Sequence, residues 1–209
     1  PGDPAAYFAG MAADAASVEE VRRQLGLDKS LPEQFLRYVA DLATGDWGRS
    51  VSTGYPVTEE LLRRLPASLE LTLFGLLFAL AAALPLGVCA ALKPGSWVDH
   101  LCRVVVTAGV SLPTFFVGLV LVYVFYYLLG WAPSPLGRLD LYTTPPPQIS
   151  GFYVVDSLLA ADLAALRASL AQLCLPAITL GLFVMAPLAR MSRAALLGAL
   201  QSDYVRTAR

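Results

Sequence analysis

Three long stretches without a charged residue constrain the fold of this chain more than any other feature of its sequence. They cover residues 71–92, 104–129 and 168–189. A helix of about 20 apolar residues crosses the hydrocarbon core of a bilayer, because each residue adds about 1.5 Å. Only 15% of all residues are charged and 56% are hydrophobic, whereas soluble domains are about 25% charged. The sequence therefore predicts an all-α, polytopic transmembrane helical bundle with three visible transmembrane helices.

Prolines lie inside all three predicted spans. Pro85 lies in the first span, Pro113 in the second, and Pro176 with Pro187 in the third. A proline frees a backbone carbonyl, and membrane helices tolerate this loss. We predict a kink at Ser111 and Pro113, which either lines a pathway or serves packing alone, and a bend at Pro176.

Two polar segments flank the predicted spans. Residues 1–66 are predicted to form an extracytoplasmic helical segment, with capping boxes at Ser17 and Ser30. A short helix over residues 58–65 is expected to end at Pro66. Residues 67–209 then form the predicted transmembrane domain, which includes a proline-rich extracytoplasmic loop over residues 132–167.

The distribution of basic residues predicts the orientation of the spans. Residues 190–209 carry four arginines against one acid, and residues 93–103 carry two basic residues against one acid. Residues 132–167 carry two arginines against three acids. Short cytoplasmic segments are enriched in Lys and Arg. We therefore expect residues 93–103 and 190–209 inside, and residues 1–66 and 132–167 outside.

No pattern in the sequence predicts catalysis, a cofactor site or a metal site. The single histidine, His100, lies in a short loop, and no Gly-x-Ser-x-Gly or His-Glu-x-x-His motif occurs. The three cysteines, Cys89, Cys102 and Cys174, form no Cys-x-x-Cys pair and are expected to act as small hydrophobes. Glu70 is expected at the membrane interface rather than as an ion site. Membrane lipid is the predicted surrounding, and nucleic acid is not a predicted partner.

Seven short motifs, in order along the chain, carry a resemblance to one family of membrane proteins. The motifs are residues 1–4 (PGDP), 45–50 (GDWGRS), 64–71 (RLPASLEL), 111–115 (SLPTF), 175–181 (LPAITLG), 189–193 (ARMSR) and 203–209 (DYVRTAR). Their order and the spans between them resemble the permease subunits of bacterial dipeptide/oligopeptide/nickel-type ABC importers. The resemblance implies the type I ABC importer permease fold, with residues 67–209 in the permease domain. It also implies a multi-pass location in the bacterial inner membrane and further spans beyond this fragment.

The resemblance implies a function and a set of partners as well. Such a subunit forms a translocation path for short peptides together with a second homologous permease subunit. Two ATP-binding-cassette ATPase subunits hydrolyse ATP on the inner side, so this chain itself is not expected to be an enzyme. An extracytoplasmic solute-binding protein is expected to dock on residues 1–66 and 132–167. Nickel chelates, glutathione and opines are alternative substrates within the family.

Residues 190–209 resemble the start of the cytoplasmic coupling loop through which such permeases contact their ATPases. Of the first three positions of the family pattern Glu-Ala-Ala-x-x-x-Gly, only Ala208 keeps the residue type. Ala194, Ala195, Gly198 and Ala199 are small enough for close approach to a partner. The alternative is an ordinary amphipathic helix beside the membrane. The candidate coupling residues are Asp203, Tyr204, Val205, Arg206, Thr207, Ala208 and Arg209.

A non-ABC polytopic membrane protein is the main alternative. A secondary transporter or a structural membrane subunit would also contain apolar spans. Secondary transporters usually carry charged groups inside their spans, and the three predicted spans carry none. A structural subunit leaves the series of motifs unexplained. We therefore expect an ABC importer permease.

Overall fold

The computed structural model describes residues 3–10, 13–50, 52–140 and 142–202. Within these ranges all regular secondary structure is helical, and the only β-type pairing is an isolated bridge between Arg49 and Pro56. This confirms the predicted all-α class. The chain divides into two compact units, Pro1–Arg64 and Leu65–Arg209, which are described in turn.

The first unit contains three capped helices: α1 (Pro4–Ala9), α2 (Ala15–Gln24) and α3 (Leu31–Ala43). The capping box predicted at Ser30 is confirmed, because the Glu33 carboxylate accepts a hydrogen bond from the Ser30 backbone N–H at 3.1 Å. The cap predicted at Ser17 is wrong. The α2 helix begins earlier, at a turn where the Asp14 carboxylate accepts from the Ser17 N–H at 2.9 Å.

The first apolar stretch lies in a helix that continues past Pro66. The α4 helix extends over Val57–Leu92, with Pro66 and Pro85 inside it, so the helix end predicted at Pro66 is wrong. Each proline removes one backbone donor, whereas the rest of the helical hydrogen-bond ladder persists. The Pro66 ring also lies close to Gly151: a Cβ on Gly151 would lie 3.0 Å from its Cγ.

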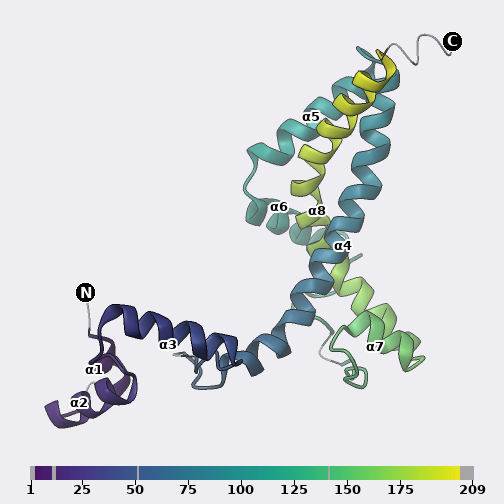
Figure 1. Ribbon diagram of the computed structural model, residues 1–209. Coiled ribbons are helices and arrows are strands. Elements are labelled where there is room, and N and C mark those ends of the chain that lie inside the picture. The colour runs from purple at the N-terminus through teal and green to yellow at the C-terminus, as the bar shows by residue number, and fades with distance from the viewer. Residues whose placement is uncertain (1–2, 11–12, 51, 141, 203–209) are drawn as a thin grey trace. The chain divides into compact units, whose positions relative to one another are not determined.

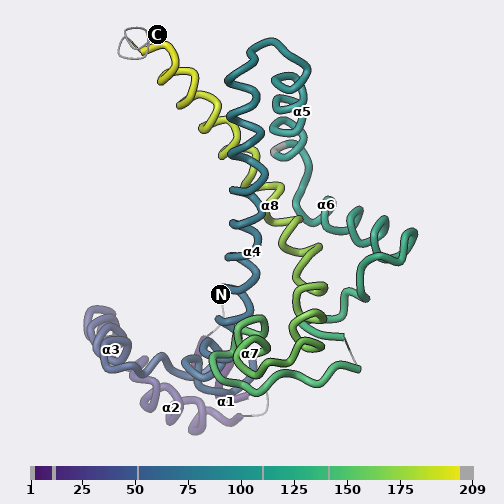
Figure 2. Tube along the Cα trace, turned by 90° about the vertical axis from the view of Figure 1, so that its right-hand side faces the viewer, coloured from purple at the N-terminus to yellow at the C-terminus, as the bar shows by residue number. Residues whose placement is uncertain are grey.

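The second predicted span is a sharply bent pair of helices rather than one helix. The α5 helix (Trp97–Ser111) is followed by α6 (Thr114–Leu121) and the π-helical segment η1 (Val122–Leu128). The bend between the two parts is 107°, and Figure 2 shows α6 turning sideways from the end of α5. The break follows from Pro113, because the residue before a proline avoids helical geometry; Leu112 is extended, with φ −99° and ψ 135°.

The third predicted span lies inside α8 (Leu163–Leu200), which follows the short helix α7 (Tyr153–Leu159). The α8 helix contains Pro176 and Pro187 without ending at either. Within the described residues, α4 and α8 are each long and apolar enough to cross a membrane, and the bent pair makes a third span if it counts as one. Two continuous membrane-length helices therefore match two of the predicted spans, and the bent pair occupies the place of the third.

Helices α4, α5 and α8 lie side by side in Figures 1 and 2. Glycines allow α4 and α8 to approach closely: a Cβ on Gly75 would lie 3.3 Å from the Leu180 Cβ, and one on Gly87 would lie 2.8 Å from the Ala189 carbonyl oxygen. Small residues at such crossings favour helix association in membranes. The buried residues between the three helices are Ala79, Ala83, Ala90, Cys102, Met185 and Ala189.

Candidate functional site

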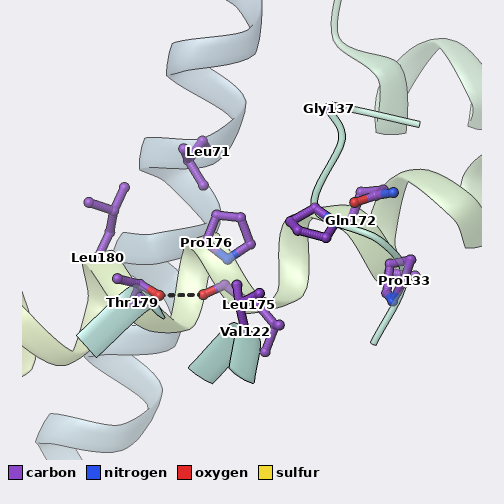
Figure 3. Close-up of a pocket in the computed structure, with 12 residues that line it drawn as sticks. Leu71, Val122, Pro133, Gly137, Gln172, Leu175, Pro176, Thr179 and Leu180 are labelled. Carbon is purple, nitrogen blue, oxygen red and sulfur yellow. Dashed lines mark hydrogen bonds between the residues drawn. The ribbon is translucent and has the colours of Figure 1, made fainter. Parts of the chain in front are cut away.

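An apolar cavity lies in the second unit, where α4, the segment from α6 to η1, and α8 meet a loop. Its volume is about 470 Å³. Figure 3 shows Leu71 of α4 and Leu180 of α8 on its wall, with Val122 of η1 nearby. The full lining is Leu71, Gly118, Val122, Pro133, Pro135, Gly137, Ala171, Gln172, Leu175, Pro176, Thr179 and Leu180.

The two polar side chains of this cavity, Gln172 and Thr179, each donate a hydrogen bond within the protein. The Thr179 hydroxyl donates to the Leu175 carbonyl at 2.8 Å, the bond drawn in Figure 3. The Gln172 amide donates to the Ser134 carbonyl at 3.0 Å and so holds the loop against α8. A wall of this kind offers a solute mainly apolar contact, with few polar groups to fix its orientation.

The residues predicted to line a pathway are divided between two places. Pro176 lies in the wall of the cavity. Ser111 and Pro113 do not line it; the Ser111 hydroxyl donates to the Thr107 carbonyl at 2.7 Å, one turn back in α5. A smaller cavity of about 250 Å³ lies at the α5–α6 bend, and Thr179 borders both cavities. The bend at Pro113 and the helical Pro176 therefore lie beside neighbouring cavities, while their use as a pathway remains a prediction.

A buried ion pair holds the loop beside this cavity to α4. Glu70 is 3% exposed and accepts from Arg138 at 2.8 Å and from the Val154 backbone N–H at 2.8 Å. Arg138 also donates to the Gly151 carbonyl at 2.9 Å and lies 3.6 Å from the centroid of the Tyr153 ring. The expectation of a simple interfacial Glu70 missed this network. Its partner lies 68 residues away in the sequence, so no local pattern could reveal it.

A second buried carboxylate shapes the same loop. Asp156 in α7 is fully buried and accepts from the Ser150 hydroxyl and from the backbone N–H groups of Ile149, Ser150 and Gly151. Burial by itself raises the pKa of this carboxyl, but the hydrogen bonds from these residues outweigh burial and lower the pKa below its ordinary value. The loop is thus built around an ionised Asp156.

A third carboxylate joins α5 to α8 at the other end of the bundle. Asp99 is fully buried and accepts from Arg193 of α8 at 2.8 and 3.1 Å and from Arg103 at 2.8 Å. It also accepts from the Gly95 backbone N–H at 3.0 Å. From the sequence alone, Asp99 was considered only as the one acidic residue in the basic loop 93–103. The i,i+4 spacing of Asp99 and Arg103 could have predicted their contact. No sequence pattern could have predicted the contact between Asp99 and Arg193.

The predicted coupling residues, 203–209, lie outside the described residues. The described part of α8 continues past the third predicted span and ends at Leu200. Among the described residues no group of three or more His, Cys, Asp or Glu side chains is arranged to hold a metal ion. Cys89, Cys102 and Cys174 are free thiols, and of these only Cys102 is buried.

Comparison with known proteins identifies the family. Residues 83–209 match the family described as binding-protein-dependent transport system inner membrane component. The chain belongs to this family. Residues 1–72 also match the N-terminal part of the membrane components of such systems. Membership accounts for the apolar helices of this permease-family chain, confirms the resemblance drawn from its motifs, and locates it in the inner membrane.

Several relatives of this permease-family chain are described as transporters of short peptides. It is 46% identical to a probable D,D-dipeptide transport system permease protein of Escherichia coli K12, over all of this chain and 61% of the relative. It is 44% identical to a di/tripeptide transport system permease protein of Pseudomonas aeruginosa, over 62% of that protein. A glutathione transport system permease protein of Escherichia coli K12 is 35% identical over 58% of its length. The chain thus spans about three fifths of the length of these relatives.

Proposed function

We propose that this chain is part of a permease subunit of an ABC importer, which forms a translocation path for short peptides together with a second permease. The observation that carries the proposal is the family match, combined with an almost uncharged cavity between α4, α6–η1 and α8. The relatives named above are permeases of D,D-dipeptide, di/tripeptide and glutathione transport systems, and this supports short peptides over nickel chelates or opines as the substrates.

The proposed partners follow from the use of ATP hydrolysis to drive import. A second permease completes the path, two ATPase subunits hydrolyse ATP inside, and a solute-binding protein delivers the peptide outside. The apolar cavity supports this division, because a path lined by satisfied groups does not itself select strongly among solutes. Selectivity is then supplied by the binding protein. Residues 203–209 are the proposed start of the ATPase contact, and residues 1–66 and 132–167 the proposed external docking surface.

An ATPase assay on the assembled system tests the proposal. The full-length permease and its partner permease, purified without ATPase subunits, should hydrolyse no ATP. Adding the two ATPase subunits should give a basal rate, and adding the peptide-loaded binding protein should raise that rate. The matched control is the same complex with peptide-free binding protein. Hydrolysis by the permease pair alone, or a rate indifferent to the loaded binding protein, would contradict the proposed role.

A further inference from the structure

Three helices meet at the end of the bundle where Asp99 is buried. Asp99 lies in the first turn of α5, and Arg193 lies in α8 after Pro187. The guanidinium of Arg193 contacts both carboxylate oxygens of Asp99, through Nε at 2.8 Å and Nη2 at 3.1 Å. A two-point Arg–carboxylate contact fixes orientation as well as distance. The direction of α8 at Arg193 is therefore set by α5.

The α4 helix holds the same turn of α8 from another side. A Cβ on Gly87 would lie 2.8 Å from the Ala189 carbonyl oxygen, 2.8 Å from the Ser192 Cβ and 3.2 Å from the Arg193 backbone nitrogen. Direct contact of helix backbones leaves little freedom for α8 to slide or rotate alone. Residues 189–193 are consequently held by packing against α4 and by an ion pair with α5.

The arrangement connects the end of α8 with the cavity. The α8 helix continues from Arg193 to Leu200, toward the residues proposed to contact the ATPase. The α5 helix leads from Asp99 to the bend at Leu112, after which Gly118 of α6 lies on the cavity wall. A displacement of the α8 end that carried Asp99 with it would therefore move α5 and the α6 wall. Rigid-body motion of this kind is a common means of coupling distant sites.

We propose that Asp99 is a positioning residue that acts through Arg193 to transmit ATP-driven movement from the end of α8 to α5 and the cavity. This inference rests on the proposed function and adds a residue with a specific role to it. An unpaired buried charge is costly, so a pair that served stability alone would affect assembly. A pair that transmits movement must in addition affect how much peptide is carried per ATP hydrolysed.

The decisive quantity is the number of ATP molecules hydrolysed per peptide imported by the full-length complex in liposomes. Asp99→Asn retains the size of the side chain and removes the charge that Arg193 and Arg103 bind. We expect the assembled complex to keep hydrolysing ATP. The number of ATP molecules hydrolysed per peptide should rise at least about fivefold, because coupling between distant sites typically changes an equilibrium by this factor or more. Arg193→Lys keeps the positive charge but cannot contact both carboxylate oxygens of Asp99 with a planar guanidinium, and it should raise the ratio of ATP to peptide by a smaller factor.

Two control variants separate transmission from stability. Arg103→Gln removes a mostly exposed partner that makes one contact and should leave the ratio at the parental value. Glu70→Gln disrupts the other buried ion pair and should lower the amount of assembled complex without changing its ratio. A parental ratio in Asp99→Asn, or an equal rise in Glu70→Gln, would overturn the proposal. If Asp99→Asn does not assemble, a parental ratio in Arg193→Lys overturns it and a raised ratio supports it.

A separate result would contradict the proposed function itself. If the parental complex imports no peptide when ATP is supplied, the chain is not part of such an importer and Asp99 has no coupling to serve. If the parental complex imports peptide and only the Asp99 and Arg193 variants have a raised ratio of ATP to peptide, the result supports the positioning role of Asp99.

Discussion

At the scale of single residues, the second unit is organised by three buried carboxylates, Glu70, Asp99 and Asp156. Each carboxylate accepts hydrogen bonds from a different part of the chain. Glu70 accepts from one arginine and one backbone N–H, and Asp99 accepts from two arginines and one backbone N–H. Asp156 accepts from groups of a single loop. Buried charges persist in proteins only when they are paired or hydrogen-bonded. These side chains therefore determine which loops and helices lie together.

Removing one partner of the Glu70–Arg138 pair should destabilise the protein strongly. Arg138→Gln leaves Glu70 buried with its charge unpaired, and breaking a buried pair in this way costs about 3–5 kcal/mol. Thermal unfolding of the purified full-length protein in detergent measures the loss. Arg63→Gln is the matched control, because Arg63 is mostly exposed and pairs with exposed Glu59, an arrangement worth little. Equal changes in the two variants would contradict the assigned role of Arg138.

Asp156 should make the stability of the protein dependent on pH in the acid range. Its pKa is lowered in the folded state, so its contribution is fully present above the ordinary aspartate pKa of about 3.9 and is lost as the pH falls through the lower folded value. At pH 7 the parent should therefore unfold at a higher temperature than Asp156→Asn. The difference should shrink as the pH is lowered below about 4. A difference that stays constant from neutral to acid pH would contradict this account.

At the scale of elements, the sequence predicted where apolar helices occur and that Pro113 bends the second one, but not that α4 continues through Pro66. Pro113 breaks the second apolar stretch, whereas Pro66 and Pro176 lie inside continuous helices. A proline always removes a donor, but tertiary contacts decide whether the helix continues. Pro66 lies against Gly151, a residue of a loop far along the chain. The sequence therefore predicted the spans and a kink at Pro113, whereas the size of that bend, 107°, required the structure.

The same limit applied to the site. The position of Pro176 in an uncharged stretch is local information, and the structure places this residue in the cavity wall, while a pathway role for it stays a prediction. The Glu70–Arg138 and Asp99–Arg193 pairs join residues 68 and 94 positions apart. No periodicity spans such distances, and without knowledge of which helices pack together the partners could not be assigned.

The crossing of α4 and α8 at Gly87 should not tolerate a side chain. Gly87→Ala adds a Cβ at 2.8 Å from both the Ala189 carbonyl oxygen and the Ser192 Cβ, and overpacking of this kind typically costs about 1–3 kcal/mol. Gly198→Ala is the matched control in α8, where no atom lies within 4 Å of the added Cβ. Unfolding temperatures should fall for Gly87→Ala and stay level or rise slightly for Gly198→Ala. An unchanged Gly87→Ala would show that this helix crossing is looser than described.

At the scale of the whole molecule, residues 1–66 and 132–167 are expected to face the outer side of the membrane. Single cysteines replacing exposed Tyr38 and Leu136, in full-length protein lacking its native cysteines, should react with a membrane-impermeant thiol reagent added outside intact cells. A cysteine replacing exposed Trp97 should react only after the inner side is made accessible. Labelling of the Leu136 position from the inner side alone would reverse the assigned orientation.

Peptide import driven by ATP is the decisive test of the proposed transport role. The full-length permease, assembled in liposomes with its partner permease, two ATPases and binding protein, should import a labelled dipeptide only when ATP is available to the ATPases. Import should persist when ionophores abolish ion gradients and should stop with a catalytically inactive ATPase. Import that follows an imposed ion gradient and needs neither ATP nor the ATPases would contradict the account and indicate a secondary transporter.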